Sequence, residues 1–231
     1  MFKGIFFDLD GTLLPLDLAE MMNSYFRALT IKLSPLADPI AFMNALGAGV
    51  ERMLYNDGQG TNEQVFLEVF FRHIDRDPSQ LLPVFDEFYL NEYRELGRHV
   101  VPRPEARQAV DLAAASGAQV VLATNPVFPR LAVEARLEWA GLAGYPFAAI
   151  TSYENSCFCK PNPGYYLEIL DATGLQGPDC LMVGNDTKED LVAAELGINT
   201  FLLEDFLIDR GSAYTPTWRG SWEKLLKVLG G

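Results

Sequence analysis

Acidic and polar side chains gather at four places in the chain, each just after an apolar run. The first is Asp8-Leu9-Asp10-Gly11-Thr12, which directly follows the apolar residues 5–7. The other three places contain Thr124 with Asn125, then Lys160, and then Asn185, Asp186 and Asp190. Four such segments meeting at one edge of a sheet are hard to explain as core packing, so they predict a site.

The first segment carries two carboxylates at a spacing that suits phosphate or metal chemistry. An Asp-Gly pair is common in turns, and Asp8 and Asp10 could simply end a strand. However, Asp8 follows a run that reads as buried, where an unpaired carboxylate is costly. Two carboxylates there need a cation, and ligands that are all oxygen suit Mg²⁺.

Each of the later segments has an ordinary interpretation when it is taken alone. Lys160 alone would be a surface lysine, and Thr124-Asn125 alone would be a turn. Asp186 and Asp190 could cap the helix that follows them, but that role suits one of them and not both. The joint pattern therefore carries the interpretation, and no single residue does.

Strands that alternate with helices are predicted to position these segments. Near-continuous apolar runs, typical of strands buried on both faces, occupy residues 3–9, 118–123, 147–151, 180–184 and 199–203. Helical patterns occupy residues 104–116, 129–140, 164–172 and 188–196. The alternation predicts an α/β fold with a Rossmann-like, doubly wound parallel sheet. In such sheets, ligands bind at the carboxyl ends of the strands.

A helical insertion interrupts this alternation after the first strand. Residues 16–99 lack strand-like runs and are rich in helix formers and aromatic residues. We therefore predict a core domain made of residues 1–15 and 100–231, with residues 16–99 as an inserted helical subdomain. The tail, residues 212–231, is predicted to end in a short amphipathic helix that packs on the core.

The four segments together resemble the motifs of the haloacid dehalogenase (HAD) superfamily. Its first motif, Asp-x-Asp-Gly-Thr, matches residues 8–12, and its second, a Ser or Thr at a strand end, matches Thr124. The third, a Lys commonly followed by Pro, matches Lys160, and the fourth, an acidic cluster, matches residues 184–190. Residues 16–99 resemble the family's helical C1 cap. One departure is Asn185, which stands where many members carry the first Asp of the fourth motif.

The resemblance implies a Mg²⁺-dependent phosphatase acting on a small phosphate monoester. Asp8 would attack phosphorus and become an aspartyl-phosphate, and Asp10 would act as general acid and then as general base. Thr124, Asn125 and Lys160 would bind the phosphate.

The resemblance also implies roles for the rest of the first and fourth motifs. Gly11 would let the chain turn at a positive φ, and Thr12 would orient Asp10; both are counted with the phosphate-binding residues. The metal ligands would be Asp8, the backbone carbonyl of Asp10, and Asp186. Asp190 would bind the metal through a water molecule or would contact one of these ligands without touching the metal. Asn185 could replace either Asp186 or Asp190 as a ligand.

Substrate choice is expected to lie in the cap. Candidate contacts there, each of which also reads as a solvated helix residue, are Arg27, Lys32, Asn44, Arg52 and Tyr55.

Other functions with the same motifs are weighed against this one. Phosphotransfer to an acceptor other than water, as in a sugar-phosphate mutase, would use an identical core. A phosphate-binding regulatory protein without turnover would be expected to show degraded motifs, whereas all four are present here. The dehalogenase branch lacks the second aspartate of the first motif, so Asp10 argues against that chemistry.

Composition limits the partners and the location. The net charge is −13, and no basic stripe is present, which argues against nucleic acid. No apolar run is long enough for a membrane span, and Asp8 and Asp10 interrupt the apolar N-terminus, so a cytoplasmic location is expected. The three cysteines do not form a disulfide or zinc pattern. The expected partners are a small phosphorylated metabolite and, at most, a second copy of the chain in a homodimer.

Overall fold

The computed structural model describes residues 1–74 and 76–231, and its centre is a parallel sheet. The six strands run in the order β3-β2-β1-β4-β5-β6. They are β1 (Gly4–Phe7), β2 (Gln119–Leu122), β3 (Ala149–Ile150), β4 (Cys180–Gly184), β5 (Asn199–Leu203) and β6 (Trp218–Gly220). This arrangement confirms the predicted α/β class. The strands β2 and β3 lie on one side of β1, and the later strands β4 to β6 lie on its other side. The carboxyl end of β1 is therefore a topological switch point, where ligands bind in sheets of this kind.

Both faces of the sheet are covered because successive strand residues point to opposite sides. On one face, Ile5 and Phe7 pack against α6 (Pro104–Ala115), α7 (Arg130–Trp139) and α9 (Trp222–Gly230). On the other face, Phe6 packs against α8 (Pro163–Thr173) and the short helix η2 (Leu191–Leu196). Burial on both sides explains why the strands read as continuous apolar runs.

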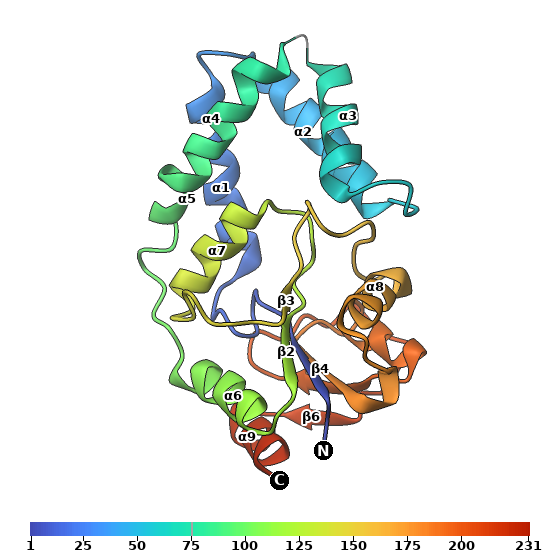
Figure 1. The fold of residues 1–231 in the computed structure, drawn as a ribbon. Coiled ribbons are helices and arrows are strands. Elements are labelled where there is room, and N and C mark those ends of the chain that lie inside the picture. The colour runs from blue at the N-terminus through green and yellow to red at the C-terminus, as the bar shows by residue number, and fades with distance from the viewer. Residues whose placement is uncertain (75) are drawn as a thin grey trace.

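Helices alone connect β1 to α6 in the part of this connection that the structure describes. We call this helical block, residues 18–95, the insert; it lies beyond the carboxyl ends of the strands (Figure 1). Its helices are α1 (Leu18–Leu33), α2 (Pro39–Leu54), α3 (Asn62–His73), α4 (Pro78–Leu90) and α5 (Glu92–Glu95). Side chains at the start of each of the four longer helices satisfy free backbone N–H groups, and Thr61 forms a full capping box with Gln64.

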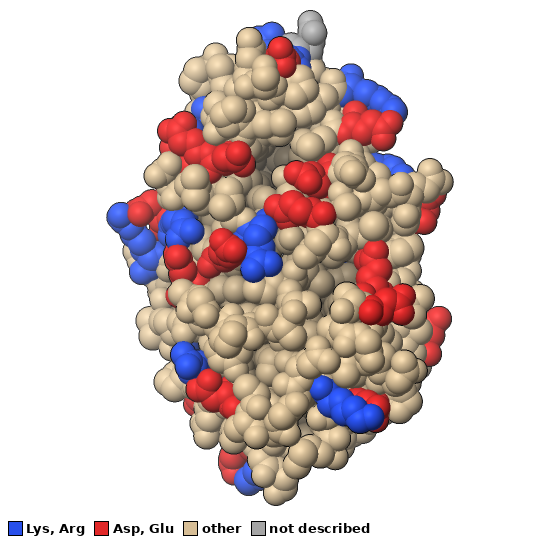
Figure 2. Space-filling view, in the orientation of Figure 1, with Lys and Arg blue, Asp and Glu red and all other residues tan. Residues whose placement is uncertain are grey.

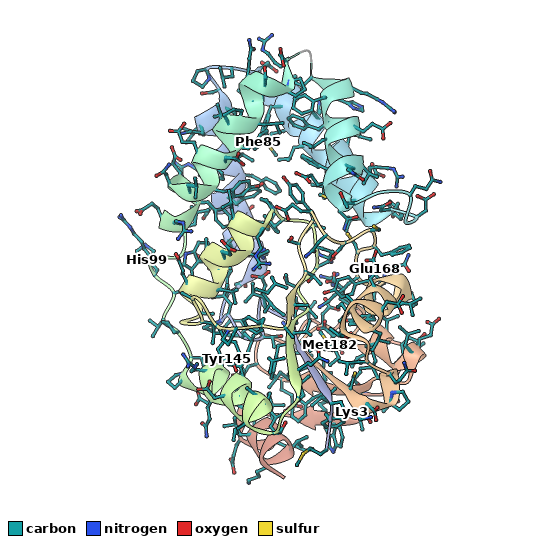
Figure 3. The ribbon with its side chains drawn as sticks, viewed as in Figure 1. Lys3, Phe85, His99, Tyr145, Glu168 and Met182 are labelled. Carbon is teal, nitrogen blue, oxygen red and sulfur yellow. The ribbon has the colours of Figure 1, made fainter. Side chains whose placement is uncertain are left out.

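Aromatic rings hold the two sides of the insert together. Phe85 on α4 points toward α2 and α3 (Figure 3), and its ring centroid lies 6.1 Å from that of Phe42 and 5.7 Å from that of Phe70. On the other side, Tyr25 of α1 lies against Phe88 and Phe128. Phe128 belongs to the loop after β2, so this contact joins the insert to the sheet.

One local prediction about the C-terminal half was wrong. The helix predicted over residues 188–196 begins only at Leu191 and is a 3₁₀ helix, because Asp186 and Asp190 hold the preceding backbone in a loop. In the tail, the predicted helix is present as α9 and packs on the core, and the edge strand β6, which pairs with β5, precedes it. Within the described ranges, none of the helices is apolar over a length that could cross a membrane.

Candidate active site

Asp8 lies at the centre of the polar edge of the sheet. Its backbone N–H donates to Val183 O at 2.9 Å, and the residue before it, Phe7, pairs with both Leu122 and Val183. The segments that follow β1, β2 and β4 therefore leave the sheet side by side. This register brings Asp8, Thr124 and the loop after Gly184 to one place.

Lys160 connects the segment after β1 with the loop after β4. Its side chain is fully buried, and its Nζ donates to Asp8 Oδ1 at 2.8 Å and to Asp190 Oδ1 at 2.7 Å. Burial alone would lower the pKa of Lys160, but Asp190 and Asp8 outweigh it and raise that pKa well above 10.5. The lysine is thus a fixed positive charge, in contrast to the surface lysine that its sequence context alone would suggest.

Burial disfavours the negative charge on the Asp8 carboxyl. Burial raises the pKa of Asp8 to about 7, Lys160 opposes the rise, and Asp190 and Asp10 add to it. One oxygen of Asp8 is held by Lys160, and no hydrogen bond to Oδ2 is found among the described residues. Asp8 therefore has one oxygen free for a further ligand.

The loop after β4 divides its two aspartates between different tasks. Asp186 Oδ1 accepts from the N–H groups of Lys188 and Glu189, which lie in the loop before η2, so neither aspartate side chain caps that helix as predicted. Asp190 uses both oxygens, one for Lys160 and the other for the N–H of Asp186 at 2.9 Å. Gly184 makes this possible, because a Cβ there would lie 2.1 Å from Asp190 Oδ2.

The turn after Asp10 packs directly on Asn185. Gly11 has φ 78°, as predicted, and a Cβ on it would lie 2.3 Å from Asn185 Nδ2. The hydroxyl of Thr12 donates to Asn185 Oδ1 at 3.0 Å, so it does not orient Asp10 as the sequence analysis expected. Asn185 also donates to Phe206 O at 2.7 Å. Both ends of its amide are therefore used to hold loops together.

Thr124 and Asn125 form the adjoining wall. The carbonyl of Thr124 accepts from Thr151 and Tyr165, whereas its hydroxyl has no hydrogen bond to any described residue. Asn125 accepts from the N–H of Lys160 at 3.2 Å and donates to Glu189 Oε2 at 3.1 Å. Thr124 thus has a free hydroxyl at the site, while Asn125 fixes the position of the Lys160 segment.

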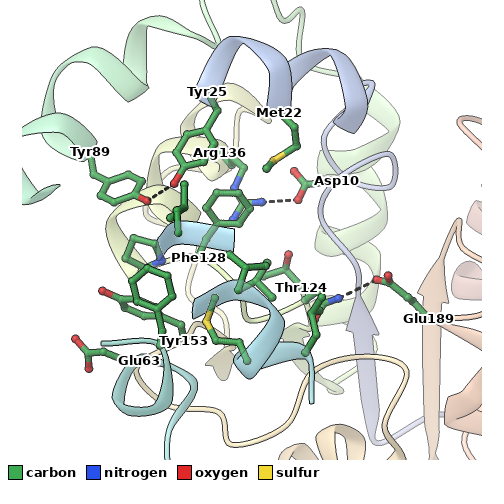
Figure 4. A pocket seen from close by; sticks show the side chains of 18 of the residues that line it. Asp10, Met22, Tyr25, Glu63, Tyr89, Thr124, Phe128, Arg136, Tyr153 and Glu189 are labelled. Carbon is green, nitrogen blue, oxygen red and sulfur yellow. Dashed lines mark hydrogen bonds and ion pairs between the residues drawn. The ribbon is translucent and has the colours of Figure 1, made fainter. Parts of the chain in front are cut away.

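Arg136, which the sequence analysis missed, forms an ion pair with Asp10 (Figure 4). Its side chain is 1% exposed; Nη1 donates to Asp10 Oδ2, Nε donates to Ala132 O, and the guanidinium lies 4.5 Å from the ring centroid of Phe128. Asp10 Oδ1 and Arg136 Nη2 are buried without a hydrogen-bond partner in the described structure. The sequence does carry one indication that Arg136 is buried. It follows Val133 by three residues and Ala132 by four, which places it on the apolar face of α7.

Arg210, also missed by the sequence analysis, reaches the site from the loop after β5. Its Nη1 donates to Glu189 Oε1 at 3.0 Å, and its Nε lies 3.1 Å from Asp186 Oδ2. The second contact is an ion pair without hydrogen-bond geometry, because Asp186 Oδ2 has no hydrogen bond within the described residues. No sequence pattern around Arg210 indicates this contact.

The donor set fits a Mg²⁺ ion that keeps several waters. Asp8 Oδ2 and Asp186 Oδ2 make no hydrogen bond to any described residue. In contrast, both oxygens of Asp190 and both ends of the Asn185 amide are already engaged. Over residues 1–74 and 76–231, no three His, Cys, Asp or Glu side chains are grouped closely enough to hold a metal by themselves. Mg²⁺ commonly binds through one or two carboxylates with water and substrate oxygens.

A cavity of about 430 Å³ opens from these residues toward the insert, and we call it the chamber. Asp8, Asp10, Thr124 and Arg136 line its floor, and aromatic and aliphatic side chains of α1 to α4 line its walls (Figure 4). The insert residues proposed from the sequence as substrate contacts are absent from this lining. Lys32 pairs with Glu87 and Glu92, and Tyr55 is 77% exposed.

The remaining proposed contacts also lie on the outside of the insert. Arg52 pairs with Asp57, and Arg27 and Asn44 are exposed. The sequence analysis could not tell which face of each helix lies toward the chamber.

Curated relatives of this chain include a phosphatase. The chain is 24% identical over 230 residues to a phosphoglycolate phosphatase of Agrobacterium fabrum, covering 91% of this chain and 89% of that protein.

Solved structures with the same fold include two kinds of enzyme. A HAD phosphatase from Thermococcus onnurineus matches with a TM-score of 0.63 and 20% identity, covering 99% of this chain and 98% of that one. The L-2-haloacid dehalogenase from Xanthobacter autotrophicus, with chloropropionic acid covalently bound, matches with a TM-score of 0.61 and 16% identity, covering 100% and 99%. At these identities the structures show a shared fold.

The sequence profile of the haloacid dehalogenase-like hydrolases matches residues 2–197, which is most of the chain. That range includes all four motif segments and the whole insert. The resemblance found in the motifs is confirmed, and the chain belongs to the haloacid dehalogenase-like hydrolases.

Proposed function

We propose that this enzyme is a Mg²⁺-dependent phosphatase that hydrolyses a small phosphate monoester through an aspartyl-phosphate on Asp8. The observation that carries the proposal is the state of the Asp8 carboxylate. It is buried at the switch point, Lys160 holds one oxygen at 2.8 Å, and the side chain lines the chamber. A carboxylate fixed in this way keeps one orientation toward a phosphate group in the chamber.

In the first step, an oxygen of Asp8 forms a bond to phosphorus while the bond from phosphorus to the ester oxygen breaks. Asp10 gives its proton to the departing oxygen, so the leaving group departs as an alcohol. In the second step, water attacks phosphorus, the bond to Asp8 breaks, and Asp10 takes a proton from that water. Inorganic phosphate leaves, and both aspartates return to their initial states.

Arg136 has a positioning role in this scheme. It holds Oδ2 of Asp10, so Oδ1, which has no partner among the described residues, is directed to the reacting oxygens. The hydroxyl of Thr124 and the charge of Lys160 would bind phosphate oxygens. Asp190 would position Lys160, since both of its oxygens are engaged.

Asp8, Asp186 and the backbone carbonyl of Asp10 would hold Mg²⁺. The ion would offset the repulsion between an anionic nucleophile and an anionic phosphate. Asp186 Oδ2 and Asp8 Oδ2, which make no hydrogen bond to any described residue, support this assignment. The insert would act as the cap that excludes water during the first step.

The comparisons support a phosphatase over a dehalogenase. The A. fabrum relative, at 24% identity, is named as a phosphoglycolate phosphatase, whereas the X. autotrophicus dehalogenase, at 16% identity, shows only a shared fold. Asp10 and its ion pair with Arg136 also favour the phosphatase, because that chemistry needs an acid and base beside the nucleophile.

The direct test is the release of p-nitrophenol from p-nitrophenyl phosphate by the purified enzyme. We expect turnover with Mg²⁺, none with EDTA, and none in Asp8→Asn. The matched control is Asp17→Asn, which changes an exposed aspartate at the start of α1 and should keep full turnover. Turnover that persists in Asp8→Asn would contradict the proposal.

A further inference from the structure

We propose that the physiological substrate carries an apolar leaving group without negative charge, and that the chamber selects against esters of hydroxy acids and against sugar bisphosphates. The inference rests on the proposed function and names the class of substrate. It is drawn from the walls of the chamber, the charges around it and its size.

The walls that the insert contributes are apolar. Residues of α1 and α2 that line the chamber include Met22, Phe26, Leu46 and Val50, and the other helices add aromatic rings such as Phe66. Among the described insert residues in the lining, none is Lys, Arg or His. A phosphate ester with a second anionic group would therefore find no cation on this side.

The ionisable groups that the insert does contribute are acidic. Glu63 and Asp86 line the chamber, and neither makes a hydrogen bond or ion pair through its side chain with any described residue. Burial, Glu154 and Asp86 raise the pKa of Glu63. Figure 2 shows acidic side chains beside the hollow between the insert and the sheet. An anionic leaving group would meet repulsion here.

The two arginines of the chamber already have carboxyl partners. Arg136 pairs with Asp10, and Arg210 pairs with Asp186 and Glu189. The Nη2 of Arg136 has no partner among the described residues, so it can donate to one uncharged oxygen near the ester. A carboxylate on the leaving group would have to compete with Asp10 for this arginine.

The size of the chamber also exceeds what a two-carbon acid would fill. About 430 Å³ lies at the lower end of ordinary small-molecule sites. An aromatic or branched aliphatic group would contact the rings of Tyr25, Phe66 and Tyr89, whereas a short acid would leave those walls without a partner. An apolar group would gain binding energy from the same area that a charged one would have to desolvate.

The test compares three esters whose leaving groups are all primary alkoxides, so their intrinsic reactivity is similar. These are 2-phenylethyl phosphate, ethyl phosphate and phosphoglycolate, with Mg²⁺ and with the Asp8→Asn rate subtracted. We expect kcat/KM to fall in that order, with roughly 10- to 100-fold between the first and the last, as expected for apolar pocket discrimination. A preference for phosphoglycolate would overturn the inference.

Two variants keep the test independent of folding effects. Val50→Arg places a cation in the wall on α2, and it should lower kcat/KM for the phenylethyl ester and raise it for phosphoglycolate. Its matched control is Ile40→Arg on the same helix, where the side chain is 74% exposed. This control should leave kcat/KM unchanged for all three esters. Glu63→Gln removes a charge without changing shape, so phosphoglycolate hydrolysis should rise about fivefold, as expected for a Coulomb repulsion that water largely screens. A Glu63→Gln variant that changes all three esters equally would overturn the inference.

Failure of this inference differs from failure of the proposed function. Mg²⁺-dependent hydrolysis of p-nitrophenyl phosphate together with a preference for phosphoglycolate would overturn only the substrate class. The absence of Mg²⁺-dependent release from every ester, p-nitrophenyl phosphate included, would overturn the proposed function and this inference with it.

Discussion

The polar edge of the sheet and the chamber beneath the insert are built on opposite principles. At the edge, Lys160, Asp190 and Asn185 each make two contacts that hold separate segments together. In the chamber, the insert supplies apolar walls, and its two carboxylates, Glu63 and Asp86, have no partner among the described residues. Few substitutions should be tolerated at the edge, because each polar side chain there is a hydrogen-bond partner of another residue of the network. The walls can change without breaking such a network, so we expect the chemistry to be fixed at the edge and the selection of substrate to be adjustable in the chamber.

The largest expected effect comes from breaking the network at Lys160. In Lys160→Met, Asp8 and Asp190 lose their shared cation, and we expect the unfolding free energy to fall by about 3 kcal/mol or more and turnover to fall at least ~10³-fold. The double variant Lys160→Met/Asp190→Asn should regain part of the stability and none of the turnover. Urea denaturation and steady-state kinetics would measure both. Turnover of Lys160→Met within tenfold of the wild type would show that the edge is not the catalytic centre.

Arg136 should show an intermediate effect, because it lies where the edge meets the chamber. Arg136→Met leaves Asp10 without its partner, so we expect kcat to fall about 10²-fold, in the range found for a misplaced acid or base. Arg136→Lys should restore little, since a lysine cannot reproduce the planar contacts to Asp10 and Ala132 O. The matched control is Arg130→Met on the same helix, where the exposed ion pair with Glu134 contributes little. An unchanged kcat in Arg136→Met would refute the positioning role.

The smallest expected effect is a pH-dependent response to Mg²⁺. The metal-free pKa of Asp8, raised by burial to about 7, lies above its ordinary value of 3.8, so protonation stabilises the folded state. This stabilisation is complete below about pH 4 and is lost as the pH rises through about 7. Because Mg²⁺ competes with that proton, the rise in Tm on adding Mg²⁺ should grow across pH 6 to 8. Each kcal/mol of stabilisation by Mg²⁺ should raise Tm by about 2–4 °C in a chain of this size.

Asp8→Asn is the control for this measurement, and its response should be small and nearly independent of pH. Lys160, Asp190 and Asp10 also face Asp8, and they are unchanged in this variant. An equal response to Mg²⁺ in both proteins would place the ion elsewhere.

The sequence predicts the parts of this molecule that depend on local patterns. The parallel sheet follows from the apolar runs, and the meeting of Asp8, Thr124, Lys160 and Asp186 follows from their places after strands. Arg136 and Arg210 could not be predicted in the same way, because their partners lie 126 and 24 residues away in the chain, and contacts of that kind depend on tertiary packing. The strand β6 is only three residues long and lies at the sheet edge, so its sequence pattern is weak.

The most direct test of the account is to look for the phosphate on Asp8 itself. The enzyme and its Asp10→Asn variant would be mixed with p-nitrophenyl phosphate and Mg²⁺, quenched in acid, digested and examined by mass spectrometry. The account predicts a hydroxylamine-sensitive phosphate on the peptide that contains Asp8. It should be more abundant in Asp10→Asn, where the base for the second step is missing, and absent in Asp8→Asn. Turnover by the wild-type enzyme with the phosphate on another residue, or with none on Asp8 in either protein, would contradict the central claim.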